Sequence, residues 1–192
     1  MSDFWLYIKL GLEHVLDWNA YDHVLFLMVL SVPFQFRSWK KLLILVTMFT
    51  LGHTISLVLS NYEVVSVSSA WIEWLIPITI LVGAIFNIYM AVGSKRNEKL
   101  GVLFLVAIFF GLIHGFGFGS FFKAINSEKE LVPLLEFALG IELAQLLVVL
   151  MVLLVGYIFQ TFFRMNSRDW ILILSAIVIG RVIPMLVDNW IF

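Results

Sequence analysis

The chain has 192 residues, of which 62% are hydrophobic and 13% are charged, and its formal net charge is −1. A soluble domain averages roughly 45–50% apolar and 25% charged residues, so this composition indicates a protein that is solvated by lipid. The balanced charge offers no cationic face to nucleic acid, and the absence of cysteine excludes disulfides, thiolate metal sites and cysteine nucleophiles.

The first apolar stretch is too short to cross a bilayer. It runs from Phe4 to Leu16, thirteen residues that reach only ~20 Å at helical rise, and 17–19 interrupt it before the pattern resumes at Tyr21. We therefore predict a half-span, an interfacial helix or a re-entrant helix over 4–16. The leading residues carry no positive charge and no small-residue cleavage site follows, so a cleavable signal peptide is not expected.

The rest of the chain consists of apolar runs near the ~20 residues that a hydrocarbon core of ~30 Å requires. The predicted spans are 20–33, 41–60, 71–93, 100–122, 131–156 and 169–190. The fold class is therefore predicted as all-α: a single integral membrane domain over 1–192, built as a polytopic transmembrane helix bundle of six spans plus the short N-terminal element. Seven spans are the alternative.

Positive charges alternate between the predicted loops. Three loops carry the cationic side chains Arg37, Lys40, Lys41, Lys95, Arg96, Lys99, Arg164 and Arg168. The stretch 61–70 has none, and 123–130 balances two lysines with two glutamates. By the positive-inside rule the three cationic loops face the cytoplasm. We expect a multi-pass protein of the bacterial inner (plasma) membrane whose C-terminus lies outside.

Ionisable side chains lie inside the apolar segments, where each costs at least ~2.5–3.5 kcal/mol at the bilayer centre and by default marks function. They are Glu13, His14, Asp17, Asp22, His23, His53, Glu73, His114, Glu136, Glu142, Arg181 and Asp188. All four histidines of the protein are among them. His53 lies twelve residues past Lys41 and His114 fourteen past Leu100, so helical rise places both at ~18–21 Å from the cytoplasmic side. The set converges on the outer half or the midplane.

Imidazoles and carboxylates without thiolate are typical ligands of first-row divalent metals. Asp22 and His23 are adjacent and ~100° apart on a helix, so only one of them can point fully at a metal ion. The other would lie beside the ion or support the first ligand from behind. Each histidine alone could equally tie two helices together by a hydrogen bond, but the shared depth favours a common site. The side chains expected to support it are Glu13, Ser56, Glu73, Gln145, Arg181 and Asp188.

Glycines recur every fourth residue across His114, at Gly111, Gly115 and Gly119. This spacing predicts a small-residue face that another helix approaches closely. A nucleotide-binding loop is not expected, because the run neither follows a strand nor carries a phosphate-binding lysine.

Four segments combine histidines or carboxylates with small and apolar residues: GLEHVLDWNAYDHVLFL at 11–27, FTLGHTISL at 49–57, FGLIHGFGFGS at 110–120 and FALGIELAQL at 137–146. In this order they resemble the HupE/UreJ family of small bacterial membrane proteins, whose members are associated with nickel supply to hydrogenase and urease. The resemblance implies that the metal-handling residues are His14, Asp22, His23, His53, His114 and Glu142.

Three functions fit these observations. The first is secondary transport or uptake of a divalent transition metal, nickel by resemblance, with zinc, cobalt and iron not distinguished. The second is an intramembrane zinc hydrolase acting on lipid, in which Ser56 or Glu142 assists. The third is a membrane assembly protein with a structural metal. The expected partners are the bilayer and the metal ion, with a homo-oligomer left open; nucleic acid and ATP are not expected, since the short connections hold no nucleotide-binding domain.

Overall fold

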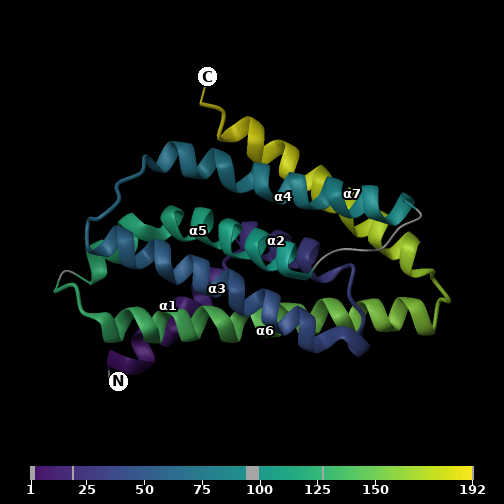
Figure 1. Cartoon of the computed structure of the whole chain (residues 1–192), viewed down its shortest axis with the longest axis horizontal. Helices are drawn as coiled ribbons and strands as arrows, with labels where there is room; N and C mark the ends of the chain where they lie inside the picture. Colours follow the sequence, from purple (N-terminus) through teal and green to yellow (C-terminus); the bar gives the residue numbers. More distant parts are fainter. Residues whose placement is uncertain (1–2, 19, 94–99, 127, 192) are drawn as a thin grey trace.

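The computed structural model describes residues 3–18, 20–93, 100–126 and 128–191, which form α-helices and no strand. The helices are α1 (Asp3–Leu16), α2 (Asp22–Ser31), α3 (Trp39–Asn61), α4 (Ser69–Val92), α5 (Leu100–Ile125), α6 (Leu131–Thr161) and α7 (Ser167–Asp188), with a short 3₁₀ helix (Phe36–Ser38) before α3. They run side by side as one bundle (Figure 1). The all-α membrane bundle predicted from the sequence is confirmed.

Five helices, α3 to α7, are long and apolar enough to cross a membrane, with lengths from 22 to 31 residues. The stretch predicted as a span over 20–33 is the helix α2, which has 10 residues. At ~1.5 Å per residue it reaches only ~15 Å, so it cannot cross a hydrocarbon core alone.

Helices α1 and α2 follow one another across the bundle as a single broken span (Figure 1). The Tyr7 hydroxyl near the start of α1 donates to the Ile125 carbonyl at the end of α5. At the far end of α2, Val32 packs in a cluster with Trp170 near the start of α7. Two short helices therefore run in succession from one end of the bundle toward the other, and the break between Leu16 and Asp22 coincides with the polar interruption in the sequence.

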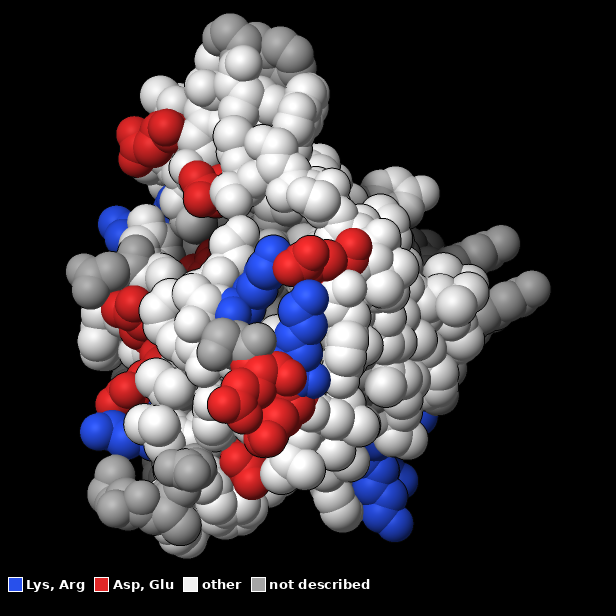
Figure 2. All heavy atoms as spheres, turned by 90° about the vertical axis from the view of Figure 1, so that its left-hand side faces the viewer, with Lys and Arg blue, Asp and Glu red and all other residues white. Residues whose placement is uncertain are grey.

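The connections gather at two ends of the bundle. One end, called the cationic end, holds the turns around Arg37, Gly93 and Arg164; the other, the terminal end, holds 62–68, 128–130, the start of α1 and the end of α7 (Figure 1). Lys95, Arg96 and Lys99 lie outside the described residues. Figure 2 shows acidic and basic side chains gathered at the middle of the terminal end.

Two helix pairs approach so closely that only glycine fits between their backbones. A Cβ atom at Gly111 would collide with the Phe49 carbonyl of α3, and one at Gly115 would collide with the His53 carbonyl. On the opposite side, Gly11 of α1 meets the Phe137 carbonyl of α6. The close approach predicted from the α5 glycine repeat is confirmed, and it places α5 directly against the segment of α3 that carries a histidine.

Candidate metal centre

Four histidines from four helices meet in the middle of the bundle. They are His14 of α1, His23 of α2, His53 of α3 and His114 of α5. The ring centroids lie 4.5 Å apart for His14 and His23, 5.6 Å for His14 and His53, and 5.4 Å for His23 and His114. His53 and His114 are 0% and 1% exposed. We call these four residues the histidine cluster.

Three members of the cluster, His14, His23 and His53, form a group that could hold a metal ion, because one ligand atom from each lies within 4.8 Å of the others. The Nε2 atoms of all four rings, and Nδ1 of His53, are buried without a hydrogen-bond partner among the described residues. A buried polar atom left unpaired costs about 1–3 kcal/mol. Unpaired nitrogens of three rings at this spacing fit a metal-binding site, whereas His114, whose ring centroid lies 5.4 Å from that of His23, is not part of the group of three.

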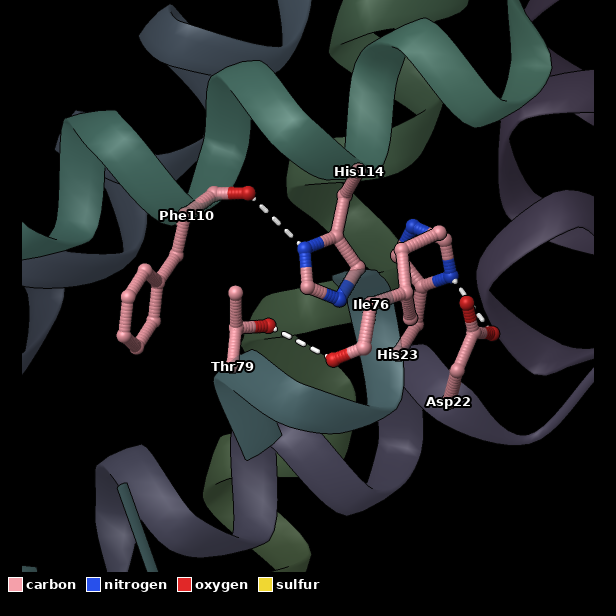
Figure 3. Close-up of polar contacts among 6 residues, drawn as sticks. All are labelled: Asp22, His23, Ile76, Thr79, Phe110 and His114. Atoms are coloured by element: carbon pink, nitrogen blue, oxygen red, sulfur yellow. Dashed lines mark hydrogen bonds and ion pairs between the residues drawn. The ribbon is translucent and has the colours of Figure 1, made fainter. Parts of the chain in front are cut away.

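Two hydrogen bonds orient the cluster's rings. Nδ1 of His23 lies 3.1 Å from an Asp22 carboxylate oxygen, and Nδ1 of His114 lies 2.8 Å from the Phe110 carbonyl (Figure 3). If Nδ1 donates in both rings, each Nε2 lone pair is left free to bind a metal. Such an outer partner, a carboxylate or a carbonyl behind a histidine, is typical of metal ligands. Adjacency allowed either residue to point at the metal, and in the structure Asp22 supports the His23 ring from behind.

A layer of aromatic rings closes the cluster on the side of the cationic end. Phe26 and Phe49 stack with centroids 4.5 Å apart, and each lies 5.2 Å from the His114 ring. Phe110 contacts Phe26 edge-on at 5.7 Å. Phe26 follows His23, Phe49 precedes His53 and Phe110 precedes His114, each by about one helical turn. All three rings therefore lie on the side of the histidines that faces the cationic end. We call Phe26, Phe49 and Phe110 the phenylalanine layer.

Hollows lie on both sides of this centre. Beyond the phenylalanine layer, a cavity of ≈ 320 Å³ extends between α2, α4, α5 and α7 from Phe26 and Phe110 to Ser167 and Arg168. On the other side, His14 lines a groove of ≈ 570 Å³. The remaining lining residues of the groove include Glu13, Asp17, Trp18 and Phe118. The cluster therefore lies between a surface groove and an inner cavity.

Glu142 lies in a different group of side chains. Its carboxylate accepts hydrogen bonds from the Thr47 hydroxyl at 2.7 Å and from the Thr50 hydroxyl, and Thr50 also contacts Oε1 of Gln145 at 2.9 Å. The group of three histidines that could hold a metal does not include it. The role of Glu142 as a metal ligand stays a prediction. Thr47 and Thr50 were not predicted from the sequence as partners of Glu142, although Thr50 precedes His53 by one helical turn.

The other expected supporting residues occupy varied places. The Ser56 hydroxyl donates to the His53 carbonyl at 2.8 Å, so it secures the backbone of α3. Glu13 is exposed and pairs with Lys9 at 3.5 Å. The Arg181 guanidinium lies 4.8 Å from the centre of the Tyr21 ring. Glu73 and Asp188 are exposed.

Comparison with known proteins identifies a family for nearly the whole chain. The family model described as "HupE / UreJ protein" matches residues 1–189. No curated protein and no solved structure matches the chain.

Proposed function

The chain belongs to the HupE/UreJ family, which is associated with nickel and cobalt uptake, and on that premise we propose that it takes up a divalent transition metal ion by secondary transport. The histidine cluster carries the proposal, because unpaired ring nitrogens of His14, His23 and His53 come together from three helices of a membrane bundle, with the His114 ring beside them. Imidazole nitrogen suits nickel, cobalt, zinc and iron, and the family makes nickel the first candidate.

The ion enters through the groove lined by His14. Glu13 and Asp17 in its wall attract a hydrated cation, and His14 belongs both to the groove and to the cluster. Inside, the ion exchanges water for nitrogen atoms of His14, His23 and His53, with His114 as the fourth ligand.

The phenylalanine layer then acts as the gate. A constriction of apolar rings excludes water and so blocks a hydrated ion until the rings move. Beyond the layer, the cavity that reaches Arg168 gives the ion room to regain its water. By the positive-inside rule the cationic end faces the cytoplasm, so this path runs inward across the bacterial inner membrane. A reporter fused after residue 192 should therefore read as outside.

The test is uptake of radiolabelled nickel by proteoliposomes that contain the full chain. We expect saturable uptake by the wild type, loss of uptake for His53→Ala, and normal uptake for Ser175→Ala. Ser175 is an equally buried polar residue of α7 that has no hydrogen-bond partner in the part of the chain that the structure describes, so it serves as the matched control. Equal uptake by wild type and His53→Ala would contradict the proposal. Zinc-dependent release of fatty acid from the liposomes without uptake would favour the hydrolase instead.

A further inference from the structure

A second polar group lies between α3 and α6, one helical turn from His53 toward the cationic end. It consists of Thr47 and Thr50 of α3 and Glu142 and Gln145 of α6, joined by the hydrogen bonds of the Glu142 carboxylate and the Thr50 hydroxyl. Thr50 and Gln145 are 8% and 0% exposed, whereas Thr47 lies on the flank of the bundle. We call these four residues the oxygen cluster.

The Thr50 hydroxyl has more acceptors around it than protons to donate. It carries one proton, yet three acceptors surround its oxygen: a Glu142 carboxylate oxygen, Oε1 of Gln145 at 2.9 Å and the Val46 carbonyl at 3.3 Å. If that proton goes to Glu142, Oε1 of Gln145 lies beside the hydroxyl oxygen without a proton between them. Turning the amide over would let it donate to Thr50, but the Gln145 oxygen would then replace Nε2 as the buried atom without a partner among the described residues. In either arrangement the Gln145 oxygen lacks an electropositive partner.

The charge of the cluster is also uncompensated. Glu142 is its one carboxylate, and among the described residues no Lys or Arg forms an ion pair with it. An ionised carboxylate at membrane depth is expensive unless a counter-charge lies beside it. A bound cation would supply both that charge and the missing partner of the hydroxyl and amide oxygens.

We propose that the oxygen cluster binds a sodium ion. Carboxylate, hydroxyl and amide oxygens are ligands of hard cations rather than of the transition metals that imidazole prefers. One carboxylate balances one monovalent ion, whereas a divalent ion would leave a net positive charge inside the membrane. The chain thus holds two cation sites of different chemistry one turn apart on α3. That sodium entry drives metal uptake rests on the proposed function; the sodium site itself does not.

Thermal unfolding of the metal-free, full-length protein in detergent tests the site. Sodium, potassium and choline chloride are compared at equal ionic strength and pH, because a ligand that binds only the folded state raises the melting temperature with its concentration. We expect a saturable rise in sodium alone, accompanied by binding of about one labelled sodium ion per chain. Identical melting temperatures in the three salts, without labelled sodium bound, would overturn the site.

Four variants locate the effect. Glu142→Gln should abolish the sodium-dependent rise and Thr50→Val should shift its midpoint to at least tenfold higher sodium, whereas Thr50→Ser, which keeps the hydroxyl, and His53→Ala should retain it. A sodium effect that survives in Glu142→Gln contradicts the assignment. Stabilisation that follows pH alone, equally in all three salts, overturns sodium in favour of a protonated Glu142. Nickel uptake that proceeds without sodium refutes the coupling while leaving the metal proposal intact.

Discussion

The histidine cluster and the oxygen cluster lie one turn apart on α3, yet the fold builds them differently. The oxygen cluster is shared by two unbroken helices, and its residues at i, i+3 on each helix face one another. The histidine cluster draws on four helices, two of which are the halves of a broken span. His14 and His23 would be separated by about 13.5 Å along a continuous helix, but their ring centroids lie 4.5 Å apart. The break between α1 and α2 is what lets them meet.

This contrast predicts that metal binding depends on the broken span, whereas sodium binding depends only on α3 and α6. His53→Ala, Asp22→Asn and Gly11→Val separate the two sites when transition-metal binding and the sodium-dependent rise in melting temperature are measured for each variant.

His53→Ala should give the largest effect. The substitution removes one of the four proposed histidine ligands and leaves a coordination position that water must fill, so we expect metal affinity to fall by more than the roughly 10–100-fold typical of losing an outer partner. Isothermal titration of nickel into the metal-free protein measures this. The sodium-dependent rise should persist, and its loss would show that the two clusters are one site.

Asp22→Asn should weaken metal binding by about 10–100-fold, because the variant keeps the shape of the side chain but removes the negative charge behind the His23 ring. The same titration measures the change. A loss as large as that of His53→Ala would instead indicate that Asp22 binds the ion directly.

Gly11→Val tests the broken span without touching a ligand. Its side chain would collide with the Phe137 carbonyl and push α1, which carries His14, away from α6. Overpacking costs typically ~1–3 kcal/mol, so we expect about a tenfold loss of metal affinity if the helix shifts. The sodium-dependent rise shows which helix yields: it should change little if α1 moves, whereas a reduced rise would show that α6, which carries Glu142 and Gln145, has moved instead. Unchanged metal binding would mean that α1 can move without displacing His14.

Glu63→Gln should have the smallest effect, because it should change neither transition-metal binding nor the sodium-dependent rise in melting temperature. Glu63 is exposed at the terminal end, where hydrogen bonds and ion pairs with Lys123 at 2.8 Å and Lys129 at 3.3 Å lower the pKa of its carboxyl. A lowered pKa in the folded state means that the carboxylate stabilises the protein at neutral pH and that this contribution is lost as the pH falls through the lowered pKa. The melting temperature of Glu63→Gln should be slightly below that of the wild type at pH 7, and the two should converge in acid. A gap that widened in acid would contradict this assignment.

The sequence by itself determined that the chain is an all-α membrane protein. Hydropathy and helical rise depend on each segment's own composition, so they indicated the five long helices and placed His53 and His114 at a common level. The glycine repeat at 111, 115 and 119 indicated a close contact, because the lack of a side chain is itself a local property. The polar interruption at 17–19 marked the place where the first crossing breaks.

Only the tertiary structure decided which of these groups face one another. Asp22 and His23 could each have pointed at the centre, and packing placed Asp22 behind the His23 ring. The sequence predicted Glu142 at the level of the histidines, but the structure places it against Thr47 and Thr50, about one helical turn closer to the cationic end, because depth along a helix does not determine which neighbour a side chain meets. The partner of a helical face depends on contacts between segments far apart in the chain, and these are fixed by packing the whole bundle, not by any one segment.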